Sequence, residues 1–155
     1  MADSDDGPDP RPLARRAREG ELAAVLALRF AVFCLEQGVP EELERDSGDA
    51  TAVHLVLDDA GTVIGTCRLM RAGERMRLAR MAVARERRGE GLGALLLAHA
   101  HEVARQAGAR EVELHAQVAV RGFYERAGYV AEGEVFEDAG IPHVVMRRPL
   151  SPLGR

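Results

Sequence analysis

The sequence contains no lysine, no tryptophan and only two cysteines among its 155 residues. Without lysine, no ε-amino group can act as a catalytic base or complete a Walker-type phosphate loop. Cys34 and Cys67 fit neither a metal-ligand spacing nor a disulfide framework, so we interpret them as small, partly buried apolar residues. His99 and His101 stand two positions apart in a helical pattern and point in different directions, so they cannot share a metal ion. We therefore expect no metal site.

Long apolar segments and a basic charge balance are also absent. No apolar run approaches the roughly twenty residues of a membrane-spanning helix, and no charged-then-apolar leader is visible at the N-terminus. The formal net charge of -4 gives no general reason to bind nucleic acid, which requires a basic surface. We expect a cytoplasmic protein that binds neither nucleic acid nor a membrane.

The length and the 46% hydrophobic composition suit one compact domain and are short for two. Residues 1–12, MADSDDGPDPRP, are acidic, rich in proline and devoid of bulky apolar groups. Such a segment cannot compensate for the entropy lost on ordering, which predicts a flexible tail. We expect the single domain to span residues 13–150.

The first predicted element is a helix that begins near Gly20. Its apolar positions recur at intervals of three and four residues and share one side with Arg29: Leu22, Val25, Leu26 and Phe33. A buried arginine requires a partner or a ligand because an unpaired guanidinium is costly to desolvate. Alternatively, the Arg29 stem packs while its charged head reaches water. A polar loop, EQGVPEELERDSGD, follows.

Three short strands are predicted next. The segment AVHLVLDDAGTVIGTCRLM forms two of them around a turn at residues 59–61, with Val53, Leu55 and Leu57 on one face. The third strand, MRLARMAV, repeats the alternation at every second residue from Arg77 to Val83 through Ala79 and Met81. Consecutive short strands of this kind indicate an antiparallel meander.

The hydrophobic period then becomes helical over residues 92–107, and Gly108 can end that helix in a left-handed conformation. REVELHAQ returns to strand periodicity, so strand, helix and strand form a parallel, right-handed βαβ unit. A short helix over residues 118–127 and a terminal hairpin over 129–150 complete the chain. We predict an α+β fold with a mixed, mostly antiparallel central sheet, one parallel βαβ unit and helices on both faces.

A glycine-rich loop, RRGEGLG, links the third strand of this meander to the long helix. Its spacing is RxxGxG, from Arg88 through Gly91 to Gly93. The first turn of a helix has unpaired backbone N–H groups and a partial positive charge, and glycines let a phosphate approach them. The loop follows an antiparallel meander rather than the first strand of a parallel sheet, which argues against a dinucleotide-binding fold. The sequence therefore predicts a different diphosphate site.

With RMAV before the loop and FYERAGY at residues 123–129, the sequence resembles the GNAT superfamily of N-acetyltransferases over about residues 13–149. VFCLEQGVPEELERDSGDATAVHLV and GIPHVVM further resemble a small bacterial subgroup. The resemblance implies acetyl-CoA as cosubstrate, with its pyrophosphate on the glycine loop and its pantetheine arm along the preceding strand. The residues implied to bind it are Met81, Ala82, Val83, Arg88, Gly89, Glu90, Gly91, Leu92, Gly93, Ala94 and Tyr124.

The resemblance also implies acetyl transfer to the primary amine of a small molecule or peptide, directly within a ternary complex. Tyr124 matches the tyrosine of the family that lies near the CoA sulfur and could protonate the leaving thiolate. His115 on the last strand of the βαβ unit, or Glu36 in the early polar loop, could accept the proton of the amine.

Acceptor binding is expected from residues far apart in the chain: Arg29, Glu44, Arg68, Gln117 and His143. His115 and Gln117 share one face of their strand. The acidic loop that contains Glu44, Asp46 and Asp49 could attract a cationic amine, although each carboxylate alone is typical of a solvated loop. The sequence leaves room for a homodimer.

Two other functions stay open at this point. RFAVF, ELERDSGD and CRLM resemble the N-terminal half of acyl-homoserine lactone synthases, in which an arginine, acidic residues and a later arginine follow in similar order. The absence of tryptophan and the complete RGEGLG loop favour an acetyltransferase over such a synthase. A non-catalytic sensor that binds acetyl-CoA is the third reading.

Overall fold

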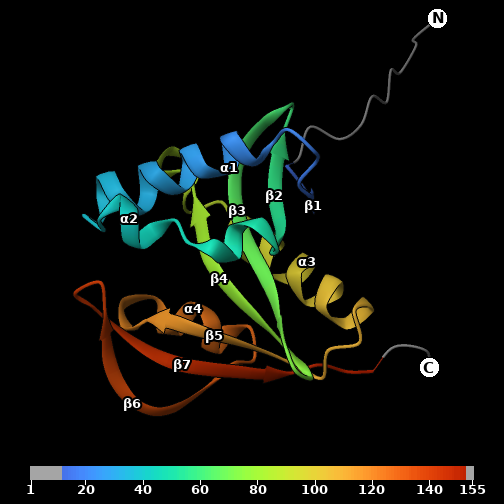
Figure 1. Ribbon diagram of the computed structural model, residues 1–155. Helices are drawn as coiled ribbons and strands as arrows, with labels where there is room; N and C mark the ends of the chain where they lie inside the picture. The colour runs from blue at the N-terminus through green and yellow to red at the C-terminus, as the bar shows by residue number, and fades with distance from the viewer. Residues whose placement is uncertain (1–11, 153–155) are drawn as a thin grey trace, which may run out of the picture.

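A seven-stranded sheet organises residues 12–152, the part of the chain that this computed structural model describes (Figure 1). The strands lie in the order β1-β2-β3-β4-β5-β7-β6. Their bounds are β1 Leu13–Arg16, β2 Val53–Asp59, β3 Thr62–Ala72, β4 Arg75–Val83, β5 Glu111–Gln117, β6 Val130–Asp138 and β7 Ile141–Pro149. The predicted tail, except for Pro12, lies outside the described residues.

Helical segments connect these strands. They are α1 Leu22–Arg29, the π-helical η1 Phe30–Glu36, α2 Glu41–Glu44, α3 Leu92–Gln106 and α4 Arg121–Arg126, with short 3-10 turns η2 Ser47–Ala50, η3 Arg85–Arg87 and η4 Val118–Val120. Figure 1 shows α1 and α2 on one face of strands β2 to β4 and α3 on the other. Of the strand pairs, β4 and β5 are parallel and the others are antiparallel. The predicted α+β fold with one βαβ unit is confirmed.

The main hydrophobic core lies between the sheet and α3. Strand β2 alternates as predicted: Leu55 and Leu57 are fully buried in this core, and Val53 packs against it. Of the positions that the helical spacing of α3 predicted on one side, Leu92, Leu96, Ala100 and Val103 are buried in this core, whereas Leu95 and Ala107 are exposed. Leu97 and Ala104 are buried as well and were not predicted. The helix ends as expected, because Gly108 takes a left-handed conformation with φ of 80°.

Strand β4 departs from the predicted regular alternation because it contains a β-bulge. Arg80 and Met81 together stand opposite the single residue Cys67 of β3, and Arg80 has a positive φ of 56°. One extra residue in a strand reverses the facing of the side chains that follow it. The expectation that Arg77, Ala79, Met81 and Val83 share one face is therefore wrong beyond the bulge.

The parallel pair β4–β5 is short, and this feature positions the site. Arg75 to Leu78 pair with Glu111 to Leu114, and no further register pair follows in the described structure. Beyond Leu78 the two strands separate (Figure 1). The backbone edge of β4 that faces β5 is thereby left without a strand partner over residues 79–83.

The elements predicted from the sequence differ from the observed ones in three places. Strand β1 at the sheet edge was not predicted. The loop taken as irregular contains α2, whose first turn is acidic and so complements the positive end of a helix, and η2, which begins with a capping box between Asp46 and Asp49. The helix predicted over residues 118–127 consists of η4 followed by α4, and Gly128 follows α4 with φ of 93°.

Candidate functional site

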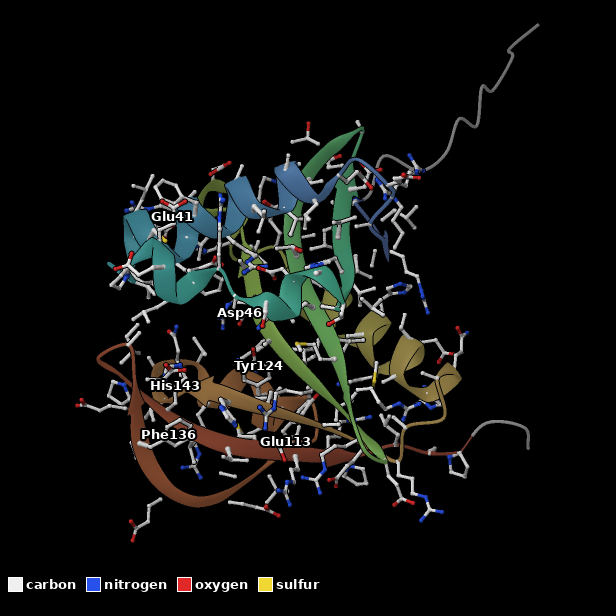
Figure 2. The ribbon with its side chains drawn as sticks, in the orientation of Figure 1. Glu41, Asp46, Glu113, Tyr124, Phe136 and His143 are labelled. Atoms are coloured by element: carbon white, nitrogen blue, oxygen red, sulfur yellow. The ribbon has the colours of Figure 1, made fainter. Side chains whose placement is uncertain are left out.

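A cleft of about 1010 Å³ opens where β4 and β5 separate. Its lining combines the bulged part of β4, the glycine loop and the start of α3, the inner side of η1 and α2, and the ends of β5 and β7. Figure 2 shows Asp46 on the half of the molecule that carries α1 and α2, His143 on the C-terminal hairpin, and Tyr124 in the region between them. The cleft therefore joins segments that are remote in sequence.

The glycine loop lies at one end of the cleft. Gly89 and Gly91 have φ of 84° and 77°, and Gly91 is the N-cap of α3 in the left-handed conformation. A Cβ built on either glycine would meet no described atom within 4 Å, whereas one on Gly93 would come within 3.3 Å of the Phe123 ring. The first two glycines thus leave open space beside the helix start, and the third allows α3 and α4 to pack closely.

These features fit the diphosphate of a CoA thioester. The open glycines adjoin unpaired N–H groups in the first turn of a 15-residue helix, where an anion is stabilised. All of the predicted cofactor residues line the cleft except Glu90, whose carboxylate is bonded to Arg87. The free edge of β4 offers backbone groups to an amide-containing arm.

Arg88, the first residue of the RxxGxG motif, is bonded to Glu36. Its two terminal nitrogens lie 2.8 and 3.1 Å from the Glu36 carboxylate oxygens, and its Nε donates to the Val83 carbonyl. The hydrogen bond from Arg88 lowers the pKa of Glu36. Glu36 is not among the residues that line the cleft. A carboxylate of lowered pKa that is held by an arginine is a poor proton acceptor, so this placement does not support the base role predicted for Glu36.

Tyr124 occupies the middle of the cleft lining on α4. It is 7% exposed, its ring lies edge-to-face with those of Phe123 and Tyr129 at 5.0 and 5.7 Å, and burial raises the pKa of its hydroxyl. Among residues 12–152 no hydrogen bond involves this hydroxyl. The ring is thus fixed by its aromatic neighbours, and its hydroxyl stays protonated at neutral pH and free to donate.

Two imidazole rings form the wall opposite η1 and α2, and the Phe136 ring packs against both without lining the cleft. His115 of β5 meets Phe136 of β6 edge-on at 5.2 Å, and Phe136 stacks on His143 of β7 at 6.0 Å. His115, the predicted base, lines the cleft together with His143 and Gln117, two of the residues predicted to contact the acceptor. Desolvation, followed by the nearby charge of Arg77, lowers the pKa of His115, which favours its neutral form at pH 7. Gln117 donates to the Gln37 side chain at 2.8 Å and so connects this wall to the segment after η1.

Arg29 lies beneath the other wall and is 1% exposed. Its Nε donates to Glu44 at 2.5 Å and one terminal nitrogen donates to Asp49 at 2.6 Å. This settles the two readings of Arg29 left open above, because the buried guanidinium has protein partners and does not reach water. Arg29 does not line the cleft, so its predicted contact with the acceptor is wrong.

Arg68 and Arg80 extend these contacts into an ion network. Arg68 donates to Asp46 at 2.6 Å and to Asp49 at 2.8 Å, and Arg80 from the β-bulge lies 3.3 Å from Asp46. We define the buried ion network as Arg29, Arg68, Arg80, Glu44, Asp46 and Asp49. It joins α1, α2, η2, β3 and β4, and its arginines and carboxylates are equal in number.

The charges within this network affect one another strongly. Burial alone would raise the pKa of Asp49, but hydrogen bonds from Arg29 and Arg68 outweigh it and hold that pKa at about 2. Burial lowers the pKa of Arg80, and the charge of Arg68 lowers it further. Arg68 and Glu44 do line the cleft, as predicted, but both are engaged in the network. Both side chains therefore belong to the network, while the buried Nε of Arg68 has no hydrogen-bond partner among the described residues.

Several lining residues were missed by the sequence interpretation: Gln37, Arg77, Arg87, Arg126, Asp138 and Ala139. Arg126 belongs to the FYERAGY segment and Arg87 precedes the RxxGxG motif, so the two motifs could have indicated both residues. Asp138 stands at the turn between β6 and β7, and only the folded hairpin brings it to the cleft.

No helix among residues 12–152 is long and apolar enough to cross a membrane. Within the same residues, no group of three or more potential side-chain ligands for a metal ion was found.

Comparison with known proteins agrees with the geometry. The model of the acetyltransferase (GNAT) domain matches residues 16–150, and the chain therefore belongs to the GNAT acetyltransferase family. It is an acyltransferase of the N-acetyltransferase class.

Individual relatives are similar over nearly their whole length. The uncharacterized N-acetyltransferase YjcF of Bacillus subtilis is 32% identical over 131 residues, which cover 84% of this chain and 94% of the relative. A crystal structure from Lactobacillus plantarum matches with a TM-score of 0.85 at 32% identity, covering 91% of this chain and 99% of the other. That of an acyl-CoA N-acyltransferase from Pseudomonas aeruginosa has a TM-score of 0.78 at 30% identity, with coverages of 88% and 97%.

Proposed function

We propose that the protein transfers the acetyl group of acetyl-CoA to a primary amine of a small molecule or peptide, directly within a ternary complex. The observation that carries this proposal is the convergence of three features on one cleft. The open glycines at the start of α3 suit a diphosphate, the unpaired edge of β4 suits a pantetheine arm, and Tyr124 presents a free hydroxyl between them.

Residues of this chain would divide the chemistry as follows. Backbone groups of Met81, Ala82 and Val83 hold and orient the thioester, and an N–H beside it stabilises developing charge on the carbonyl oxygen. Tyr124 donates its proton to the leaving thiolate, for which its raised pKa keeps the hydroxyl protonated. One of the two histidines of the cleft wall, His115 or His143, accepts the proton of the amine.

The acceptor side favours a cationic or polar amine. Asp138 lines the cleft without an ion pair among the described residues, and Gln37 and Gln117 supply further polar groups at the same end. Val39, Leu43 and the wall of rings offer apolar surface to the carbon skeleton.

The synthase reading loses its support in this arrangement. The five residues on which it depends, Arg29, Glu44, Asp46, Asp49 and Arg68, bond to one another within the buried ion network. Their mutual ion pairs give these residues a structural role, so their order in the sequence is not by itself an argument for an acyl-homoserine lactone substrate.

Isothermal titration calorimetry with acetyl-CoA tests the shared premise. We expect saturable binding to the parent protein and a Kd at least about tenfold higher for Gly91→Glu, equivalent to about 1.4 kcal/mol, because a side chain and a negative charge would enter the phosphate site. Gly91→Ala is the matched control: it imposes the strained left-handed backbone without the charge. Absence of binding at millimolar acetyl-CoA would refute the proposal, as would unchanged affinity in Gly91→Glu.

Thiol release with a panel of amines then tests turnover. Spermidine, tyramine, glucosamine and short peptides with free N-termini cover cationic, aromatic, sugar and peptide acceptors. Turnover with any of them above the rate of acetyl-CoA hydrolysis supports the enzyme. Tight acetyl-CoA binding without turnover across the panel would instead favour the sensor reading.

A further inference from the structure

His143 is held differently from the other histidine of the cleft wall. Its Nδ1 lies 2.7 Å from the backbone carbonyl oxygen of Ile141, two residues earlier on the same strand. Its ring stacks on Phe136 with 24° between the planes, and the residue is 9% exposed while it lines the cleft. One hydrogen bond and one stacked ring therefore fix both the position and the rotation of this imidazole.

This contact determines the tautomer. A carbonyl oxygen can only accept a hydrogen bond, so Nδ1 must carry the proton. In the neutral ring Nε2 is then the unprotonated nitrogen with a free electron pair. No hydrogen bond among residues 12–152 uses this Nε2, and it is not among the buried polar atoms that lack a partner. Nε2 is therefore accessible, and the cleft is the open space that the ring lines.

The other candidate groups lack this arrangement. His115 is exposed, and no hydrogen bond among the described residues orients its ring. Glu36 is bonded to Arg88, and Glu44 is bonded to Arg29. The charged and titratable groups near His115 are Arg77 on β4, Glu113 on β5, Asp138 at the end of β6 and His143 itself. Of these, Glu113 is bonded to Arg75, Arg77 and Arg147.

We propose that His143 is the catalytic base of this enzyme, with the Ile141 carbonyl as the group that orients it; the assignment rests on the proposed acetyl transfer. The Nε2 electron pair takes one proton from the ammonium form of the acceptor, giving a neutral amine and an imidazolium. The amine nitrogen forms a bond to the acetyl carbon while the carbon–sulfur bond breaks, and the thiolate takes a proton from the Tyr124 hydroxyl. The acetylated nitrogen loses its second proton to solvent. Proton exchange with solvent then returns His143 to its neutral form and restores the hydroxyl of Tyr124. The sum is an ammonium ion and acetyl-CoA converted to an amide, CoA thiol and one proton.

The Ile141 carbonyl contributes because it stays bonded to Nδ1–H in both protonation states. A carbonyl dipole that faces Nδ1–H stabilises the imidazolium formed when Nε2 gains a proton. It also disfavours the Nε2–H tautomer, which has no free electron pair on the nitrogen that is accessible from the cleft. This is the arrangement by which a hydrogen bond on one ring nitrogen sets the role of the other.

His143→Gln tests the assignment in the full-length protein, with the panel amine that the parent acetylates fastest as the probe. We expect kcat/KM to fall by about 10²- to 10⁴-fold near neutral pH, the usual contribution of a positioned base. The deficit should shrink as the pH rises toward the pKa of the amine itself, because a growing fraction of the acceptor is then already neutral. His99→Gln makes the same exchange on α3, outside the cleft lining, and should retain the kcat/KM of the parent.

Two measurements separate the outcomes. Calorimetry should show that His143→Gln binds acetyl-CoA with the affinity of the parent, which excludes misfolding as the cause of lost turnover. Nitrogen-correlated NMR of the imidazoles in the parent should show that the neutral form of His143 carries its proton on Nδ1 and none on Nε2. Parent-like kcat/KM in His143→Gln, a deficit that does not change with pH, or an Nε2–H tautomer would each overturn the proposal. Failure of the acetyltransferase proposal itself would appear in the parent, as absent acetyl-CoA binding or thiol release.

Discussion

The two ends of the cleft are built on different principles. At the cofactor end, one continuous segment from β4 through the glycine loop into α3 supplies much of the lining, including three glycines that have no side chain and the strand edge of β4 that has no strand partner. At the acceptor end, single side chains arrive from η1, α2, β5 and β7. A site made of backbone depends on glycine positions and helix geometry, whereas a site made of side chains can change its specificity by point substitution. The comparison explains how one cofactor site could serve many acceptors.

The two ends also differ in how their charges are held. Arg88 at the cofactor end is 43% exposed and forms its ion pair with Glu36 at the surface. Arg29 beneath the acceptor end is 1% exposed and has two carboxylate partners. Exposed ion pairs contribute little and exchange easily, while a broken buried pair is costly. Arg88 at the cofactor end can therefore exchange Glu36 for a ligand. The ion pairs of Arg29 beneath the acceptor end are already formed in the protein without a ligand.

Replacing Arg29 tests the preformed side and carries the largest expected effect. Arg29→Met would leave Glu44 and Asp49 without their buried partner, and we expect the free energy of unfolding in urea to fall by about 3–5 kcal/mol. Arg121→Met makes the same exchange in an exposed pair on α4 and should cost at most about 1 kcal/mol. Similar losses in both variants would contradict the distinction between buried and exposed pairs.

Tyr124→Phe tests the region where the two ends meet. Loss of the hydroxyl should lower kcat by about 10²-fold or more with little change in the Kd of acetyl-CoA, because the ring and its aromatic contacts remain. Tyr129→Phe also removes a buried hydroxyl, but one that is bonded to His101 outside the cleft lining. It should reduce stability by about 1 kcal/mol and leave kcat unchanged. Parent-like turnover in Tyr124→Phe would exclude the proton-donor role.

Acid should weaken the network beneath the acceptor end. The pKa of Asp49 falls from 3.8 to about 2 on folding, so its contribution to stability is complete above about pH 4 and is lost as the pH falls toward 2. The shift corresponds to about 2 kcal/mol. Asp49→Asn should flatten this acid limb in unfolding experiments between about pH 5 and 2, the range that contains both the ordinary pKa of 3.8 and the lowered pKa of about 2. An equally steep limb in both proteins would show that other carboxylates govern it.

Releasing Arg88 carries the smallest expected effect. Glu36→Gln removes the carboxylate that competes for this guanidinium, and we expect acetyl-CoA to bind up to about fivefold more tightly, since an exposed pair is worth at most about 1 kcal/mol. Added salt should reduce the gain. Glu19→Gln, which removes an equal charge at an exposed position in the turn between β1 and α1, is the control for a general change in net charge. Weaker binding in Glu36→Gln would mean that Glu36 positions Arg88 for the ligand instead of competing with it.

Local patterns predicted much of the fold. The strand alternation of Leu55 and Leu57, the helical period from Leu92 and the stop at Gly108 all appear as expected. These features depend on neighbours in sequence, because periodicity and glycine conformation act within a few residues. The β-bulge at Arg80 could not be predicted in this way, because it is defined by the register of β4 against β3.

By itself the sequence determined most of the strands and helices, the βαβ unit and the place of the glycine loop before α3, because backbone conformation and residue spacing are sufficient causes for these features. Only the tertiary structure decided the fate of the charged and polar side chains. It buried Arg29 between Glu44 and Asp49, drew Glu36 to Arg88, and set His143 against the Ile141 carbonyl. The physical reason is that ion pairs and ring orientations depend on which strands and helices meet in space, and those meetings join residues that the chain keeps far apart.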